Sequence, residues 1–219
     1  MTFQTMIIQL ATCFLTTLSI FSLTLLGAVP LGLAVYFGQK SRIPPIRWLI
    51  KIYISIMRGT PLMLQMMVVF YGPNLLLGIS VPKNWRFLAV IIAFIINYAA
   101  YFAEIYRSGI ESIPVVQYEA AEVLGYSKGK TFFKIILPQM VKRVIPPMTN
   151  EVITLVKDTS LASVIGTVEM FTKAKQIAVA PRSPGMVTFA MAGLFYYVFN
   201  YLVAFLMNRL EKAFDYYKI

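Results

Sequence analysis

Polar side chains gather at residues 150–163 of an otherwise apolar sequence. Glu151, Thr154 and Asp158 are three and four residues apart, so they share one stripe of a helix. Carboxylates on such a stripe suit a cationic group, and hydroxyls beside them suit the two ends of a zwitterion. This pattern predicts a binding site for an amino acid, formed by Glu151, Thr154, Asp158 and Ser160.

The same stretch also fits a purely internal role. Lys157 would then be neutralised by a nearby carboxylate, and the serine and threonine hydroxyls would bond back to helix carbonyls. For Asp158 and for Glu151 the sequence leaves both interpretations open, substrate contact and structural pairing.

A break is predicted in the neighbouring apolar stretch, where Arg58 precedes Pro61. Proline frees a backbone carbonyl and bends a helix, and membranes tolerate such a break only where protein or water satisfies it. Gln65, one turn past Pro61, and Asn97 on the next stretch are predicted to face this place and to join the substrate site. Arg58 and Pro61 are interpreted as gating or structural residues, with snorkelling to the membrane surface as the alternative for Arg58.

The elements that position these residues are predicted to be membrane helices. The chain of 219 residues is 58% hydrophobic and 13% charged, with a mean hydropathy of +0.72, whereas soluble chains are about 25% charged. A membrane helix needs roughly 20 apolar residues. The fold class is therefore predicted to be all-α, a polytopic membrane protein in one domain over 1–219, with about five spans at 11–37, 50–77, 85–106, 145–170 and 186–208.

The charge distribution predicts an orientation and excludes several functions. Most lysines and arginines follow the first, third and fifth stretches, which places the N-terminus outside and the C-terminus in the cytoplasm. The net charge of +11 is then explained by topology, and no nucleic-acid partner is expected. Histidine is absent and Cys13 is the single cysteine, so a Cys/His metal site and a histidine-based triad are excluded.

The longest polar interruption, at about 111–140, is predicted to be an ordered cytoplasmic helix–turn–helix. Gly125 suits the position after a helix, Ser127 suits an N-cap, and the second helix is expected to end at Pro138. Just before this region, Glu104, Arg107 and Glu111 are spaced for an ion-pair ladder that supports it. An interfacial helix pair lying on lipid headgroups is the alternative interpretation.

The stretch EAAEVLGYSKGKTFFKIILP, at residues 119–138, resembles the EAA loop of the membrane subunits of ATP-binding-cassette importers. "RGTPLMLQ" from Arg58, "YFAEIYRSGIESIP" from Tyr101 and "KDTSLASVIG" from Lys157 resemble the polar amino acid branch of that family. Together these stretches cover most of the chain, from about residue 12 to 212.

The resemblance implies that the loop is a coupling helix seated on a separate cytoplasmic ATPase, which would hold ATP and Mg²⁺. This chain has no GxxxxGK[ST] motif and is expected to bind no cofactor and to be no enzyme. An extracytoplasmic substrate-binding protein and a second permease protomer are the other implied partners, in a bacterial inner membrane. Gly125 is expected to be the least replaceable residue of the loop. The residues implied to couple to the ATPase are Glu119, Ala120, Ala121, Gly125 and Lys128, with a merely solvated carboxylate as the alternative for Glu119.

The function predicted from these features is the permease subunit of an importer for polar amino acids of the cationic, glutamine or cystine type. A self-contained channel or secondary carrier is the alternative. Selectivity that lies in the binding protein is also compatible with the sequence.

Overall fold

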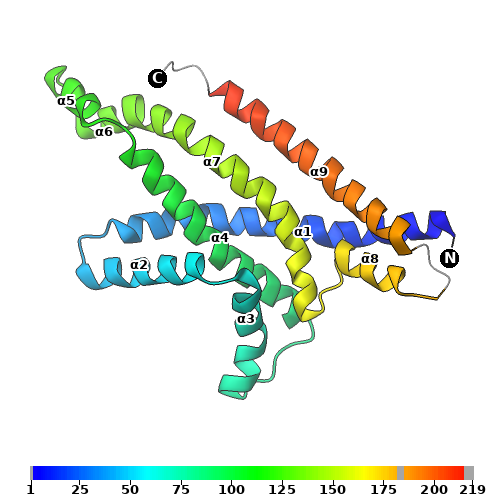
Figure 1. Ribbon diagram of the computed structural model, residues 1–219. Coiled ribbons are helices and arrows are strands. Elements are labelled where there is room, and N and C mark those ends of the chain that lie inside the picture. Colours follow the sequence, from blue (N-terminus) through cyan, green and yellow to red (C-terminus); the bar gives the residue numbers. More distant parts are fainter. Residues whose placement is uncertain (1, 182–184, 215–219) are drawn as a thin grey trace.

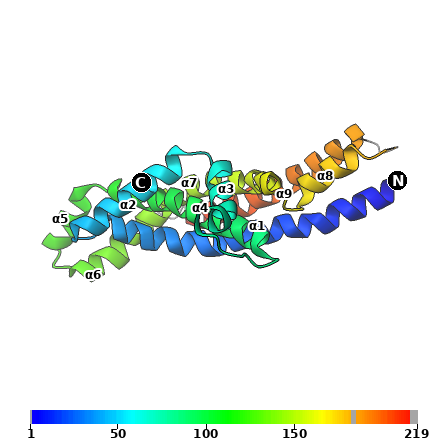
Figure 2. The ribbon, with the colours of Figure 1, turned by 90° about the horizontal axis from the view of Figure 1, so that it is seen from below.

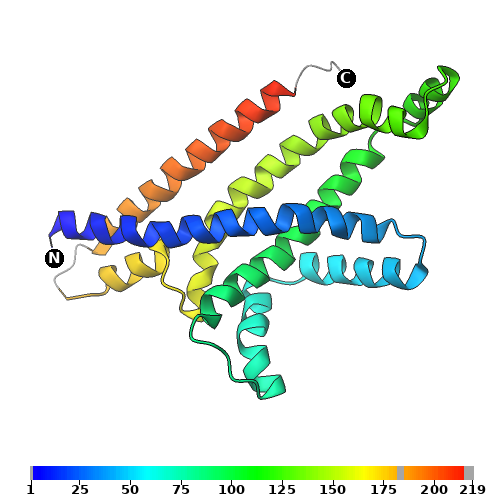
Figure 3. The same cartoon turned by 180° about the vertical axis from the view of Figure 1, so that it is seen from behind.

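The computed structural model describes residues 2–181 and 185–214, and every regular element in this part of the chain is helical (Figure 1). Helix α1 crosses the face of α4 and α7 (Figure 3). The elements are α1 (Phe3–Gln39), α2 (Pro44–Gly59), α3 (Leu62–Leu77), α4 (Trp85–Glu111), α5 (Val115–Val123), α6 (Lys128–Thr131), a π turn (Phe132–Ile136), α7 (Leu137–Asp158), a 3₁₀ turn (Thr159–Ile165), α8 (Met170–Ala178) and α9 (Gly185–Ala213).

Among the described residues, three helices are long and apolar enough to cross a membrane: α1, α4 and α9. They contain the predicted stretches 11–37, 85–106 and 186–208. The pair α2 and α3 makes a fourth candidate if it counts as one broken span. The chain is therefore an all-α membrane protein, as its composition predicts.

The predicted stretch 50–77 is not one helix. Helix α2 begins earlier, at Pro44, and the chain turns by 112° between α2 and α3. Thr60 and Pro61 both adopt extended backbone conformations at this corner. The break predicted at Pro61 is thus confirmed, and the earlier start follows because proline suits the first helical turn.

The predicted stretch 145–170 also differs from a single helix. Helix α7 ends at Asp158, a 3₁₀ turn follows, and Gly166 closes it with a φ of +75°. The Thr159 and Ser160 hydroxyls donate to carbonyls three residues earlier, those of Val156 and Lys157. These bonds favour the tighter 3₁₀ winding, because they draw the hydroxyls back over the preceding turn.

Close contact between α1 and α4 forms the centre of the core. A Cβ at Gly32 would lie 2.7 Å from the Cβ of Phe102 and 3.1 Å from the Ala99 carbonyl oxygen, so glycine is needed there for the two backbones to approach. Small residues of α4, among them Ala99 and Ala103, are fully buried on the same side. Small residues at a helix contact are the usual way in which membrane helices pack closely.

The predicted helix–turn–helix is confirmed at α5 and α6. Gly125 has a φ of +73°, its N–H donates to the Glu122 carbonyl, and the N–H of Tyr126 donates to the Ala121 carbonyl. This pair of bonds is the Schellman arrangement that ends many helices. The Ser127 hydroxyl then accepts from the N–H of Lys130 and caps α6.

The expected helix end at Pro138 is wrong. The chain stays helical from α6 through the π turn into α7, and Pro138 lies in the first turn of α7. The N–H of Leu137 donates to the Phe132 carbonyl, five residues back. This wider turn relieves the clash that a proline ring makes with the preceding turn of a regular α-helix.

The molecule is elongated, with α5 and α6 at the end farthest from the N-terminus (Figure 2). The C-terminal ends of α1, α4 and α9 and the start of α7 lie toward this same end (Figure 1). We call it the coupling end. Helix α8 lies toward the other end, in contact with α1 and α9.

Candidate functional site

The corner between α2 and α3 is held by two side-chain amides. Gln65 donates through Nε2 to the carbonyl oxygens of Met57 at 3.0 Å and Thr60 at 3.1 Å, and to the Thr60 hydroxyl at 2.8 Å. Asn97 donates through Nδ2 to the Met57 carbonyl at 3.0 Å and to the Gln65 Oε1 at 2.9 Å. Both amides therefore satisfy backbone groups that the break releases from helical bonding.

This arrangement gives Gln65 and Asn97 a structural use that the sequence did not indicate. Gln65 also lines an apolar cavity of about 340 Å³ at the corner, between α2, α3 and α4. However, the side-chain amide of Gln65 is hydrogen-bonded to the backbone of the corner, and the side chain of Asn97 is buried. Contact with a substrate stays a prediction for these two residues.

The carboxylate stripe of α7 faces α4 at one point. Asp158 accepts a hydrogen bond of 2.8 Å from the hydroxyl of Tyr98, which is 2% exposed. Glu151, two turns earlier on α7, is half-buried and forms no hydrogen bond or ion pair with any residue in the described ranges. The stripe therefore offers one carboxylate with a single hydrogen-bond partner and one that forms no hydrogen bond or ion pair among the described residues, although the charge of Arg58 acts on it at longer range.

The residues around the two carboxylates differ in how far their side chains are bonded within the protein. The Ser160 hydroxyl bonds back to the Lys157 carbonyl at 2.8 Å, as the structural interpretation expects. Thr154 is half-buried on the stripe. Lys157 is exposed, and within the described part of the chain it forms no ion pair with a carboxylate.

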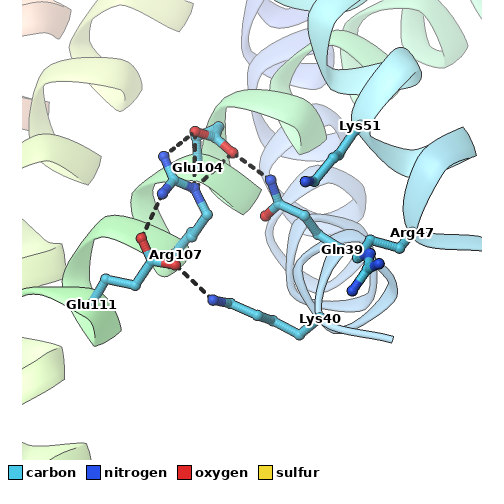
Figure 4. Close-up of a pocket in the computed structure, with 7 residues that line it drawn as sticks. All are labelled: Gln39, Lys40, Arg47, Lys51, Glu104, Arg107 and Glu111. Carbon is cyan, nitrogen blue, oxygen red and sulfur yellow. Dashed lines mark hydrogen bonds and ion pairs between the residues drawn. The ribbon is translucent and has the colours of Figure 1, made fainter. Parts of the chain in front are cut away.

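The predicted ion-pair ladder on α4 is present and larger than predicted (Figure 4). Arg107 binds Glu104 through Nη2 at 2.7 Å and Glu111 through Nη1 at 2.5 Å. Lys40 binds the other oxygen of Glu111 at 2.6 Å, and Arg58 lies 3.4 Å from Glu104. The ladder thus joins α4 to the end of α1 and to α2.

Arg58 is fixed on two sides. Besides its ion pair, its guanidinium lies over the ring of Tyr101, 5.5 Å from the centroid. Pro61 lies at the corner itself, next to Thr60. Both positions fit a structural role at the coupling side of the corner, and a gating role for either stays a prediction.

The coupling end presents apolar side chains to its surroundings. Val123 is 88% exposed, Leu124 is 70% exposed and Phe133 is 67% exposed. Glu119, Ala120, Gly125 and Lys128 are also exposed, as contact with a partner requires. Ala121 differs, because it is buried and packs inside the loop.

Two polar contacts in the core were missed by sequence reasoning. Glu169 is fully buried, where its carboxylate caps α8 by accepting from the N–H groups of Phe171 and Thr172, and it also accepts from the Tyr196 hydroxyl. A glutamate just before a short helix was the available signal. The bond from Tyr98 to Asp158 joins residues 60 positions apart and had no local signal. Across the described residues, no group of three acidic, cysteine or histidine side chains forms a metal site.

The comparison with protein families matches residues 28–216 to the binding-protein-dependent transport system inner membrane component. The chain belongs to this family. It is thus a permease subunit of an ATP-binding-cassette importer, a multi-pass inner membrane protein in a system whose ATP hydrolysis takes place in separate subunits. The alternative of a self-contained channel or carrier is not supported by its relatives.

Several relatives of this permease are amino acid transport proteins. It is 35% identical to the L-cystine transport system permease protein TcyB of Bacillus subtilis, over 92% of this chain and 84% of that protein. It is also 35% identical to the arginine transport system permease protein ArtQ of the same organism, over 90% and 88%.

A solved structure agrees with the fold of the permease. The crystal structure of an amino acid ABC transporter with histidines superimposes with a TM-score of 0.85 at 29% identity, covering 97% of this chain and 99% of that one. An inward-facing MetNI methionine ABC transporter has a TM-score of 0.70 at 18% identity, which shows the shared fold alone.

Proposed function

We propose that this permease imports an amino acid that carries an ammonium group beyond the usual zwitterion, such as arginine, lysine, histidine or cystine. The observation that carries the proposal is Glu151, a half-buried carboxylate on α7 that forms no hydrogen bond or ion pair with any of the described residues. Burying a charge away from water costs free energy unless the charge is paired, so a half-buried carboxylate without an ion pair suits a counter-charge brought by a ligand.

Asp158 supports the same proposal from the other end of the stripe. Its single bond to Tyr98 fixes the carboxylate and leaves acceptor capacity for a second donor. With Glu151 on the same face of α7, two carboxylates lie along one path, and Thr154 lies between them in sequence. Relatives named for cystine and arginine transport fit a ligand with more than one ammonium group.

The coupling end is proposed to be the place where the ATPase contacts the permease and transmits the movement driven by ATP. Val123, Leu124 and Phe133 are exposed apolar side chains at a helix–turn–helix, and they fit the groove of a partner protein. That partner is a cytoplasmic ATPase that binds ATP and Mg²⁺. Glu119, Ala120 and Lys128, which are exposed, are proposed to contact it, while Ala121 and Gly125 are proposed to set the shape of the loop.

The complete importer is proposed to contain a second permease protomer and an extracytoplasmic substrate-binding protein. A pair of protomers related by a two-fold axis is the usual way for a small subunit to enclose a pathway. The coupling end then faces the cytoplasm together with the C-terminus, and the N-terminus lies outside, as the distribution of lysine and arginine favours.

The test uses the permease co-expressed and reconstituted with its ATPase and binding protein. ATP hydrolysis is measured with a panel of cationic, dipolar and acidic amino acids. We expect Glu151→Gln and Asp158→Asn to reduce the substrate stimulation of hydrolysis at least tenfold, because each removes a charge that would bind the ligand. Basal hydrolysis should stay unchanged, and Glu211→Gln, outside the stripe, serves as the matched control.

Two results would overturn parts of this proposal. If both stripe variants keep the stimulation and specificity of the unmodified importer, the substrate site is not on α7. If the solubilised permease never retains an ATPase, even when both are co-expressed, the proposed coupling partner is wrong.

A further inference from the structure

A charged cavity of about 490 Å³ opens where α1, α2 and α4 meet at the coupling end (Figure 4). Its walls carry the carboxylates of Glu104 and Glu111 and an excess of cationic side chains. It lies apart from the carboxylate stripe of α7, and no residue of the proposed substrate site lines it.

The cations of the cavity are not all neutralised. Glu104 is paired with Arg107 and Arg58, and Glu111 is paired with Arg107 and Lys40. Within the described ranges, the side chains of Arg47 and Lys51 form neither an ion pair nor a hydrogen bond. These two residues are four apart on α2, so they project from one face of that helix, as Figure 4 shows. Two positive charges therefore face the cavity without a counter-ion.

The cavity also holds an acceptor without a donor. Gln39 donates through Nε2 to Glu104 at 2.9 Å, but its Oε1 is buried and has no hydrogen-bond partner among the described residues. A buried acceptor left unpaired costs about 1 to 3 kcal/mol. A ligand with a negative charge would pair with Arg47 and Lys51, and a hydroxyl on that ligand would reach the buried Gln39 Oε1 only after this side chain turns toward the cavity.

The surroundings of the cavity favour a lipid over a soluble ion. Phe37, at the end of α1, is 63% exposed, and Trp48, between the two cations on α2, is 64% exposed. Ile43 and Ile46, which lie near Trp48 in the sequence, are exposed too. Aromatic side chains are enriched where a membrane meets water. The acyl chains of a lipid would cover these exposed apolar side chains, whereas a soluble phosphate would leave them in water.

We propose that this cavity binds the phosphodiester headgroup of an anionic phospholipid, with Arg47 and Lys51 on the phosphate and Gln39 Oε1, once that side chain turns toward the cavity, accepting from a headgroup hydroxyl. Basic pockets between membrane helices on the cytoplasmic side suit anionic headgroups. The inference rests on the proposed orientation, which places the coupling end at the cytoplasmic leaflet. A lipid in this cavity would bridge α1, α2 and α4 beside the ladder that precedes the coupling loop.

The experiment measures lipid binding to the full-length permease, purified with its ATPase in mild detergent and delipidated. Native mass spectrometry follows titration with phosphatidylglycerol and with phosphatidylcholine of the same acyl chains. We expect one phosphatidylglycerol to bind this site in each chain, and R47Q/K51Q to bind it about 30-fold more weakly. This figure is about 2 kcal/mol, from about 1 kcal/mol for each basic residue at a membrane surface.

Two further variants make the result specific. R47K/K51R keeps both charges and should bind like the unmodified chain, which separates lost charge from lost folding. R209Q/K212Q removes two charges at the coupling end of α9, outside the cavity, and should leave binding unchanged.

Three outcomes would overturn the proposal. They are equal binding of phosphatidylglycerol by R47Q/K51Q, an equal loss in R209Q/K212Q, and displacement of the lipid by millimolar inorganic phosphate. The last would indicate a site for a soluble phosphate. Native mass spectrometry measures lipid binding and does not depend on transport. A negative result for lipid binding can therefore be distinguished from a failure of the proposed import function.

Discussion

Replacing Gly125 tests whether the shape of the coupling loop is what transmits movement. A Cβ at Gly125 would meet no atom within 4 Å, so the substitution meets no steric barrier from neighbouring residues. The φ of +73° is the remaining constraint, and it disfavours every residue with a side chain. Gly125→Asp therefore changes two things only: it strains the backbone at this turn and it adds one negative charge.

The expected cost follows from the bonds at this turn. The left-handed conformation costs a residue with a Cβ about 1 to 2 kcal/mol. If the turn opens instead, it loses the bonds from Gly125 to Glu122 and from Tyr126 to Ala121, each contributing about 1 kcal/mol. Either way the loop is destabilised by about 1 to 2 kcal/mol. This is enough to populate misplaced arrangements of α5 against α6, and too little to unfold the membrane helices.

The assay compares uptake with ATP hydrolysis in reconstituted vesicles. For Gly125→Asp we expect normal insertion and continued basal hydrolysis, with the substrate molecules imported per ATP reduced at least tenfold. Gly125→Asn should be milder, because asparagine tolerates this conformation better. Gly129→Asp is the matched control, since Gly129 is exposed on α6, meets no atom within 4 Å and has no positive φ.

Full import per ATP in Gly125→Asp would refute the reasoning, since the strained turn would then have no part in coupling. An equal loss in Gly129→Asp would also refute it, because the added charge, and not the backbone, would then be the cause.

Two further predictions concern the stability of the membrane helices. Asn97→Leu removes two hydrogen bonds at the corner and leaves the Gln65 Oε1 without its donor, so we expect a loss of about 1 to 3 kcal/mol. Thermal unfolding in detergent should fall by about 2 to 10 °C, and an equal fall for exposed Asn208→Leu would contradict this explanation. Glu104→Gln leaves a half-buried guanidinium with less counter-charge, so we expect a comparable loss that shrinks at high salt. Exposed Glu119→Gln is its control, and a melting temperature that is equally low at every salt concentration would speak against an electrostatic cause.

Features set by local spacing could be predicted from the sequence. The turn at Gly125 and the cap at Ser127 involve bonds between residues at most five apart, so the residue types determine them. The ladder of Glu104, Arg107 and Glu111 lies within two turns of one helix for the same reason. The break at Pro61 was predictable because proline cannot donate the missing helical bond.

Features that depend on packing between distant segments could not be predicted. Tyr98 meets Asp158, and Arg58 meets Glu104, only because the crossing of the helices brings them together. The error at Pro138 has a different origin. A proline normally ends a helix, but one π turn accommodates it, and nothing in the residue types of 132–136 specifies that wider winding.

The π turn has a consequence for the register between the two ends of the permease. From Lys128 to Asp158 the chain is one continuous helical rod, about 45 Å long at 1.5 Å per residue. One residue added or removed within Phe132–Ile136 would rotate everything beyond it by about 100°, which turns the carboxylates of α7 away from α4. The winding of the five residues Phe132–Ile136 thus determines the direction in which the side chain of Asp158 points, at the other end of α7.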